Sequence, residues 1–326
     1  EIASCLVGSE MCIRDRNYKL MKEEDFSGIL TEGGTILGTS RTPFKYINEP
    51  DEEGRDKVAG MIKTYKDLKL DCLVMLGGNG SHKTAALLSQ KGLNVVTLPK
   101  TIDNDIEGTE MSFGFQSAID VATRTIDEIH TTAASHSRVF IVEIMGHKTG
   151  WLTLHSGIAG GADIILIPEI PYNVDEVLDT IRKREKQGKK FTIIAMAEGA
   201  ISDEDAKLSK KELKEKRKTY TFPSVAYQLS DELQKKAGQE VRVTIPGHVQ
   251  RGGIPSASDR ILATRIGVEA AGLILRKDYG NMVCIKDGKF SKIPLEEVAG
   301  KTKMVNVDNE LIRQAESLGI SLGRKA

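Results

Sequence analysis

The chain has 326 residues, and 46 Lys and Arg side chains balance 46 Asp and Glu side chains, so the formal net charge at pH 7 is zero. This length allows two domains of ordinary size, and the balanced charge gives no bulk attraction to nucleic acid or to an anionic membrane. The four cysteines have no paired spacing, and no apolar run is long enough to span a bilayer. We therefore expect a cytoplasmic protein without a disulfide or zinc framework.

The first sixteen residues, EIASCLVGSEMCIRDR, lack the charged and apolar regions of a secretory signal. They resemble translated sequencing-adapter read-through. We expect residues 1–16 to be foreign sequence, with the native protein continuing upstream of Asn17.

Residues 26–30 form a short strand or turn in this interpretation, and they lead into the glycine-containing stretch 33–41. Its glycines permit tight turns, and Arg41 is placed to donate hydrogen bonds to a phosphate. Residues 56–68 then have the apolar spacing of a helix, with Val58, Met61, Ile62 and Tyr65 on one side.

A buried parallel strand is predicted over 71–76, followed by the turn 77–81 (GGNGS) and a helix over 81–90. A glycine-rich turn between a strand and a helix presents backbone N–H groups at the positive end of the helix. The sequence therefore predicts an anion site at this turn.

The apolar run 93–97 ends in a stretch that delivers Thr101, Asp103 and Asp105. Along an extended chain the two aspartates share one side, while Asn104 faces the other. Two carboxylates held close together suit a division of labour, with one acting as a base and one lying near a cation.

Further strands alternate with helices toward the carboxyl end, and the dense charge run 201–218 is interpreted as a solvated helix or a surface insertion. This alternation predicts an α/β fold with mostly parallel sheets. The predicted helices are 116–130, 151–159 and 258–276, and the predicted strands are 139–144, 163–167, 191–195 and 241–245.

Glycine and a polar or charged residue occur together after four of the predicted strands, at 77–81, 100–105, 145–150 and 248–253. In open α/β sheets ligands bind at the carboxyl ends of strands. We therefore expect these four loops to converge on one cleft.

The sequence TIDND at 101–105, the strand-terminal GGxGS, MGxxxGW at 145–151, AEG at 197–199 and GHxQRGG at 247–253 occur in this order. Together they resemble the 6-phosphofructokinase family from about Phe26 onward. The resemblance implies two Rossmann-like domains and phosphorylation of fructose 6-phosphate to fructose 1,6-bisphosphate. The expected domains are 17–114 with 252–298 for the phosphoryl donor, and 115–251 with 299–326 for fructose 6-phosphate.

By this resemblance, Asp103 is the base that accepts the sugar 1-hydroxyl proton, and Thr101 contacts the transferring phosphoryl group. Asp105, with Asn79, helps to hold Mg²⁺. The residues implied at the donor phosphates are Arg41, Gly78, Asn79, Gly80, Ser81 and Lys100. The residues implied at the sugar phosphate are Met145, Gly146, His147, Glu198, His248 and Arg251, of which Arg251 is also counted as catalytic.

Arg138 and Arg242 match arginines that reach the sugar 6-phosphate from a neighbouring subunit in this family. The resemblance therefore implies a homo-oligomer, a tetramer or a dimer. His130 stands where the bacterial allosteric branch of the family has an arginine, so that branch's effector site is not carried over.

The sequence departs from the family pattern in three places. Asn79 replaces a metal-associated Asp, which removes one charge, and His147 replaces an arginine that faces the transferring phosphate. The family's opening strand and its GGDxxGxN loop are absent, so we expect an N-terminally truncated chain that is inactive as written. These departures leave open a catalytically impaired regulatory subunit, although the retained Thr101, Asp103 and Asp105 argue against it.

The resemblance lies closest to the mixed branch, which contains both ATP- and pyrophosphate-dependent enzymes. Gly80 leaves room for the α-phosphate of ATP, whereas Lys100 is the residue that pyrophosphate enzymes carry. Steric room is the stronger criterion, because a lysine can bend away, so ATP is favoured and pyrophosphate is the alternative. A nicotinamide-nucleotide or lipid kinase shares GGxGS, but that interpretation leaves GHVQRGG and MGHKTGW unexplained.

Overall fold

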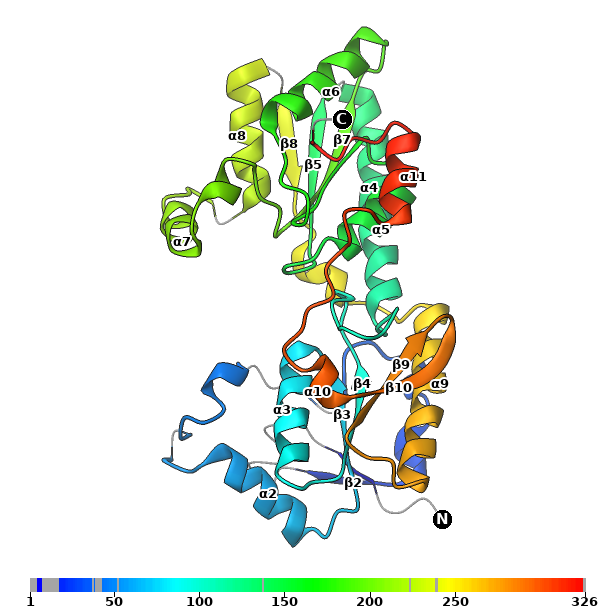
Figure 1. Ribbon diagram of the computed structural model, residues 1–326. Coiled ribbons are helices and arrows are strands. Elements are labelled where there is room, and N and C mark those ends of the chain that lie inside the picture. The colour runs from blue at the N-terminus through cyan, green and yellow to red at the C-terminus, as the bar shows by residue number, and fades with distance from the viewer. Residues whose placement is uncertain are drawn as a thin grey trace. The chain divides into compact units, whose positions relative to one another are not determined.

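The computed structural model describes residues 5–7, 18–36, 38, 43–51, 53–136, 138–222, 224–237 and 240–324. The chain forms two compact units (Figure 1). Unit 1 comprises Glu1–Thr101, Asp105–Gly114 and Gly252–Lys303, and unit 2 comprises Ile102–Asn104, Phe115–Arg251 and Met304–Ala326.

Unit 1 is built on a four-stranded sheet in the order β10-β9-β4-β3. Strand β4 is parallel to its neighbours β3 and β9 and is buried along its whole length, whereas β3 is an edge strand with Val74 and Leu76 exposed. The strands are β3 (Leu73–Gly77), β4 (Val95–Pro99), β9 (Asn281–Lys286) and β10 (Lys289–Pro294).

Helices cover both faces of this sheet, and each face has its own apolar core. One core joins Met61, Leu88 and Val298 to the strands, and the other joins Ile266 and Leu273 to Val96 and Leu98. The elements are α2 (Lys57–Asp67), α3 (Asn79–Gln90) and α10 (Leu295–Val298) on the first face and α9 (Ala257–Leu275) on the second.

The amino-terminal part of unit 1 holds only short elements. β1 (Cys5–Val7) pairs antiparallel with β2 (Lys19–Met21). The predicted strand or turn at 26–30 is a pair of short 3-10 helices, η1 (Glu23–Phe26) and η2 (Ile29–Thr31), and η3 (Phe44–Tyr46) follows.

Unit 2 is built on an all-parallel sheet in the order β6-β7-β5-β8. Every residue of β6 and β7 is buried, as both faces of a parallel sheet normally are. The strands are β5 (Val139–Ile144), β6 (Ile164–Leu166), β7 (Thr192–Ala197) and β8 (Val241–Thr244).

One face of this sheet packs on α6 and α8 through a core that includes Leu178, Ile181, Leu229 and Leu233. Helices α4 and α5 lie on the other face (Figure 1). The helices are α4 (Phe115–His136), α5 (Trp151–Ala159), α6 (Val174–Lys186), α8 (Val225–Ala237) and α11 (Glu310–Ser317).

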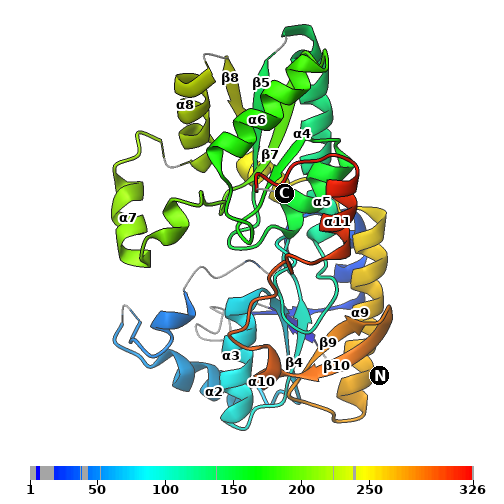
Figure 2. The ribbon, with the colours of Figure 1, turned by 45° about the horizontal axis from the view of Figure 1, so that its top comes forward.

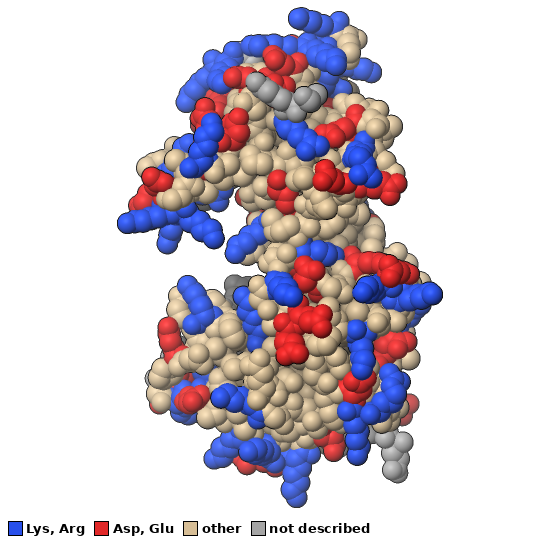
Figure 3. Space-filling view, viewed as in Figure 1, with Lys and Arg blue, Asp and Glu red and all other residues tan. Residues whose placement is uncertain are grey.

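The charge run 201–218 forms η4 (Asp205–Lys207) and α7 (Lys210–Lys218), and α7 has no buried residue. Figure 2 shows α7 standing away from the sheet of unit 2, and Figure 3 shows basic side chains gathered on it. Ser209 and Glu212 form a capping box that begins α7. Asp205 departs from the solvated helix or surface insertion predicted for 201–218, because its side chain is buried and pairs with Lys216.

The predicted α/β class with mostly parallel sheets is confirmed, and the predicted strand at 139–144 and helix at 151–159 have the observed bounds. The sequence patterns did not predict α6, α8, α10, α11 or the β9–β10 hairpin. The sequence does contain a hairpin signal, the pair Asp287-Gly288. Both residues take positive φ at the turn between β9 and β10. An Asp-Gly pair is a common two-residue turn between the strands of a hairpin.

His82 of α3 is completely buried, and its Nδ1 lies 2.9 Å from the Thr97 hydroxyl on β4. Burial lowers the pKa of His82 from 6.5 to about 4, because a charged imidazolium is poorly solvated there. The unfolded chain therefore binds a proton between these two pKa values that the folded chain does not.

We expect acidification from pH 7 to pH 5 to lower the free energy of unfolding by about 2 kcal/mol through His82 alone. Urea unfolding of the native protein and of His82→Gln at both pH values measures this contribution. The glutamine keeps a polar group beside Thr97 but does not titrate, so the variant should lose less stability on acidification. Equal losses in the two proteins would contradict the assignment.

Candidate active site

In unit 1, the ends of β3 and β4 lie side by side, because Gly77 pairs with Pro99 in the parallel register. The Lys100 N–H donates to the Gly77 carbonyl at 3.0 Å. A Cβ built on Gly78 would lie 3.9 Å from the Thr101 Cβ. The structure therefore brings Gly78 and Thr101 together, as predicted for strands whose carboxyl ends share one edge.

The helix after β3 begins earlier than expected, at Asn79 rather than Ser81. The N–H groups of Asn79, Gly80 and Ser81 are thus in the first turn of α3, where an α-helix leaves its N–H groups without intrahelical partners. Gly80 is exposed, and a Cβ built on it would meet nothing within 4 Å. This end of α3 has the polarity that favours a bound anion.

Asn79 also holds Asp105, which is buried. Its Nδ2 donates to Asp105 Oδ2 at 2.8 Å and to the Asp105 carbonyl at 3.4 Å. Asn79 Oδ1 is buried and has no hydrogen-bond partner in the described part of the chain. An asparagine can donate to the carboxylate in this way, whereas an ionised aspartate could not.

The expected alternation of Asp103 and Asp105 along an extended strand is wrong. Asn104 is buried and has φ of +51°, so the chain turns between the two aspartates. Asn104 is a residue type that tolerates this left-handed conformation. Asp103 belongs to unit 2, where its carbonyl lies 3.4 Å from the buried hydroxyl of Thr149, and Asp105 belongs to unit 1.

In unit 2, Glu198 organises the loop that follows β5. Ile144 pairs with Ala197, and the Glu198 N–H donates to the Ile144 carbonyl at 2.8 Å. Glu198 Oε1 accepts hydrogen bonds from the N–H groups of Gly146 at 3.3 Å and His147 at 2.7 Å. The structure therefore brings the predicted residues Gly146, His147 and Glu198 together.

The same loop has a tight backbone. Gly146 has φ of +141° and His147 φ of +54°, and the Thr149 N–H donates back to the Gly146 carbonyl at 3.0 Å. The loop ends at Gly150, whose N–H donates to both carboxylate oxygens of Glu169 at 3.0 Å. Burial raises the pKa of Glu169, and its hydrogen bonds from Gly150 and Val305 oppose that rise.

Gln250 connects the third loop of unit 2, η5 (Gly247–Arg251), to the same place. Its Oε1 accepts from the Met145 N–H at 3.3 Å, and its Nε2 donates to the Gly247 carbonyl at 3.1 Å. Gln250, Thr149 and Glu169 are not among the site residues that the sequence predicts. Gln250 and Thr149 lie inside matched motifs, but their support of the backbone depends on contacts that sequence spacing does not show.

His147, His248 and Arg251 are exposed side chains on these loops. Arg41 lies outside the described residues. The remaining predicted residues, Arg138 and Arg242, lie at the amino ends of the unit 2 strands, since Arg138 precedes β5 and Arg242 is the second residue of β8, whereas Glu198 follows the carboxyl end of β7.

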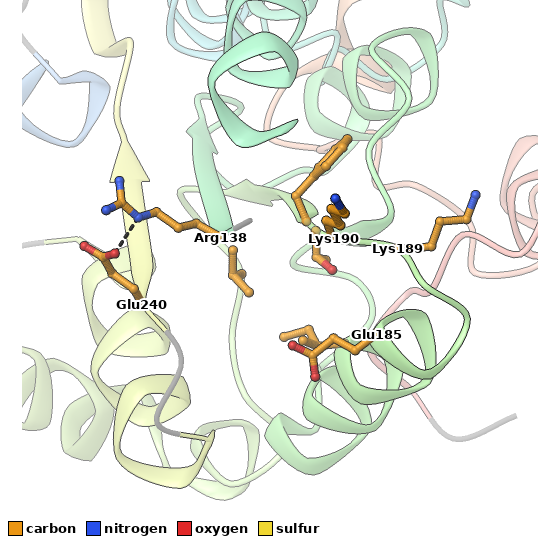
Figure 4. Close-up of a pocket in the computed structure, with 9 residues that line it drawn as sticks. Arg138, Glu185, Lys189, Lys190 and Glu240 are labelled. Carbon is orange, nitrogen blue, oxygen red and sulfur yellow. Dashed lines mark hydrogen bonds and ion pairs between the residues drawn. The ribbon is translucent and has the colours of Figure 1, made fainter. Parts of the chain in front are cut away.

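Glu240 forms ion pairs with both arginines. At this end of the sheet, a pocket of about 160 Å³ is lined by charged side chains that include Arg138, Glu185, Lys189, Lys190 and Glu240 (Figure 4). The structure therefore does not bring Arg138 and Arg242 of one chain to Glu198 of the same chain.

The groups in unit 1 fit a hard divalent cation. Such ions prefer oxygen ligands and are often bound by only one or two protein groups together with substrate phosphates. The Asp105 carboxylate and the orphaned Asn79 Oδ1 are oxygen donors held near each other by the Asn79–Asp105 hydrogen bond. The described residues contain no cluster of three His, Cys, Asp or Glu side chains that would form a complete protein cage.

Comparison with known proteins places these features in a family. The family model described as Phosphofructokinase matches residues 6–274. The chain is 54% identical over 308 residues to the ATP-dependent 6-phosphofructokinase of Spirochaeta thermophila, covering 94% of this chain and 84% of that protein. It is 45% identical over 309 residues to ATP-dependent 6-phosphofructokinase 3 of Bacteroides thetaiotaomicron, covering 94% of this chain and 86% of that protein.

Solved structures agree. Pichia pastoris phosphofructokinase in the T-state matches with a TM-score of 0.76 and 31% identity over 90% of this chain, which spans 32% of the Pichia chain. The pyrophosphate-dependent phosphofructokinase of Marinobacter aquaeolei matches with a TM-score of 0.78, covering 98% of this chain and 83% of that one, and at 20% identity it shows the fold. The chain belongs to the phosphofructokinase family, as the sequence motifs predicted.

Gly199 tests how tightly the unit 2 loops are packed. A Cβ at this position would overlap the His147 carbonyl oxygen and lie 3.1 Å from Pro168 Cγ. We expect Gly199→Ala to lower the free energy of unfolding by about 1–3 kcal/mol, the usual cost of overpacking, and to speed amide exchange at His147. Urea unfolding and hydrogen exchange measure the two effects.

Gly267→Ala is the matched control. Gly267 lies on an exposed part of α9, and a Cβ there would meet nothing within 4 Å. This substitution should leave stability unchanged or raise it by up to about 1 kcal/mol, because alanine is the better helix former. Equal behaviour of the two variants would mean that the Glu198–His147 contact is not tightly packed.

Proposed function

We propose that this chain transfers the γ-phosphoryl group of ATP to the 1-hydroxyl of fructose 6-phosphate, giving fructose 1,6-bisphosphate. Unit 1 binds ATP and unit 2 binds the sugar phosphate. The observation that carries this proposal is the segment Thr101–Asp105, which gives Thr101 and Asp105 to unit 1 and Asp103 to unit 2. One short segment thus supplies groups for both substrates of a phosphoryl transfer.

Asp103 is the base in this proposal. It accepts the proton of the sugar 1-hydroxyl as that oxygen attacks the γ-phosphorus, and the bond to the β-phosphate oxygen of ATP breaks. Phosphoryl transfer depends mainly on positioning and charge neutralisation, so the base must be fixed rather than unusually strong. The Thr149 hydroxyl restrains the Asp103 backbone. The Thr101 hydroxyl donates a hydrogen bond to the transferring phosphoryl group.

The donor phosphates lie at the first turn of α3, where the Gly78–Ser81 backbone supplies N–H groups. The open space around Gly80 supports ATP as donor, as does the naming of the curated relatives as ATP-dependent enzymes. Lys100 and Arg41 supply positive charge to the phosphates. Pyrophosphate remains the second candidate donor because of Lys100.

Asp105 and Asn79 would hold Mg²⁺ together with ATP. When bound, the ion neutralises charge on the phosphate oxygens. The Asn79 amide is neutral, so the Asp105 carboxylate supplies the negative charge that unit 1 provides to this site.

In unit 2, the sugar phosphate is bound by the Met145–His147 loop, Glu198, His248 and Arg251. Glu198 Oε1 accepts the N–H groups of the loop, and its other carboxylate oxygen accepts from a sugar hydroxyl. His248 and Arg251 are exposed and carry the donors that a phosphate or a hydroxyl needs.

Arg138 and Arg242 bind the 6-phosphate of the fructose 6-phosphate that is held by a neighbouring subunit. Their position at the amino ends of the strands, away from Glu198 at the carboxyl end of β7, supports this role. The functional protein is therefore a homo-oligomer, a tetramer or a dimer. In the described part of the chain, no helix is long and apolar enough to cross a membrane.

Asp103→Ala tests the base. We expect kcat to fall about 10²–10⁴-fold while fructose 6-phosphate binds nearly as well as before, because general-base catalysis acts in the transition state. Steady-state kinetics and calorimetric titration of fructose 6-phosphate measure both. Asp127→Ala, which removes an exposed acid on α4 of the same unit, should leave kcat unchanged. Turnover of Asp103→Ala within a few-fold of the native value would exclude Asp103 as the base.

The donor is tested by a coupled assay for fructose 1,6-bisphosphate with ATP or pyrophosphate, on this chain and on a version extended upstream of Asn17. We expect activity with ATP in the extended version only, and we expect Gly80→Asp to abolish it there, because a side chain then occupies the open space. Activity with pyrophosphate alone would mean that Lys100 decides the donor. A folded extended protein that is silent with both donors would favour a regulatory subunit.

A further inference from the structure

Lys303 is a half-buried lysine that neither the motifs nor the comparisons assign a role, and it is the last residue of unit 1. Its ammonium Nζ donates to the carbonyl of Thr109 at 2.8 Å and to that of Glu110 at 2.9 Å. Its backbone N–H donates to the carbonyl of Asp105 at 2.9 Å. One residue therefore holds both ends of the loop 105–110.

The rest of this loop is held from two other directions. Asn79 donates to the Asp105 carboxylate, as described above. At the far end, the Glu110 N–H donates to the Ile285 carbonyl at 2.9 Å, and the Thr109 hydroxyl accepts from the Ile285 N–H at 3.1 Å. Between these ends Ile106 is fully buried in the core of the unit. Among the residues that make the contacts described here, only Lys303 bonds to both the Asp105 end and the Thr109 end of the loop.

The placement of Lys303 has an energetic cost. Burial lowers the pKa of the Lys303 ammonium to about 8, while the nearby Asp105, Glu107 and Glu110 oppose this by favouring the charged form. A buried ammonium is tolerated only where carbonyls or carboxylates replace its water. A leucine or methionine would fill the same space without this cost, so packing alone does not explain a lysine here.

We propose that Lys303 is a positioning residue for phosphoryl transfer, which fixes the 105–110 loop so that the Asp105 carboxylate is oriented for the divalent cation bound with ATP. This role rests on the function proposed above. Lys303 touches neither substrate in this account and acts through Asp105. It predicts a defect in binding of the cation–nucleotide complex without a defect in sugar-phosphate binding.

The test is calorimetric titration with Mn²⁺ and a non-hydrolysable ATP analogue, with fructose 6-phosphate titrated separately. We expect Lys303→Met to weaken binding of the Mn²⁺–analogue complex about tenfold and to leave fructose 6-phosphate affinity within twofold. Lys292→Met is the matched control, because the Lys292 ammonium pairs with Asp278 elsewhere in unit 1. It removes the same charge from the same unit and should leave both affinities unchanged.

A double-mutant cycle with Asp105→Asn distinguishes positioning from a general loss of stability. If Lys303 acts through Asp105, Lys303→Met should add no further loss of Mn²⁺–analogue binding to Asp105→Asn. Fully additive losses, or native binding in Lys303→Met, would overturn the proposal. Because binding is measured without turnover, an inactive native protein would count against the proposed function and not against this role.

Lys303→Gln is the second variant, chosen because its amide can still donate to one carbonyl. We expect it to fold and to weaken binding of the Mn²⁺–analogue complex about threefold, between the native protein and Lys303→Met. If Lys303→Met fails to fold, native binding by Lys303→Gln overturns the proposal, and a loss confined to the cation–nucleotide complex supports it.

Discussion

The whole candidate active site depends on where two sets of buried parallel strands end. β4 has a hydrogen-bonded strand on each side, and every one of its residues is buried, so its side chains do not reach a ligand in solvent. In unit 2, β5 and β7 also have a strand on each side, and all their residues are buried except the half-buried Glu143. Polar side chains of the site therefore lie in the loops that follow the strands. Within each sheet, the parallel registers place these loops next to one another.

The loops at these exits are held by side chains acting on backbone groups. Glu198 and Glu169 accept N–H groups of the loop between β5 and α5, Gln250 fixes its first residue, and Asn79 fixes Asp105. Glu198 directly follows β7 and Asn79 is the first residue of α3, so these two partners are themselves anchored by regular elements. Loops without regular structure can then hold a geometry sharp enough for catalysis, because their orphan N–H groups are satisfied by rigid neighbours.

Sequence predicted the elements whose own pattern is strong, such as the apolar run 139–144, and the motifs at strand ends. It missed β10, because the only residues of KFSKIP that are not exposed, Phe290 and Ile293, are three positions apart and lack the alternation of a strand, which forms here by pairing with β9. It placed Asp103 and Asp105 on one side of an extended chain, and the left-handed backbone of Asn104 removed that geometry. The contacts of Gln250 with Met145, of Thr149 with Asp103 and of Lys303 with Thr109 join residues 105, 46 and 194 positions apart, so no local pattern encodes them.

The chain passes between its two units five times, at residues 101, 104, 114, 251 and 303, and this order governs how the protein can be made. β4 gains its second neighbour only when β9 exists, nearly two hundred residues later, and β6 is bridged by Ser321 near the carboxyl end. Domains normally fold one after another as they leave the ribosome. Here β4 has only β3 beside it until β9 begins at Asn281, after the last strand of the unit 2 sheet, β8, has ended at Thr244, so the sheet of unit 1 is completed only after all the strands of unit 2 have been synthesised.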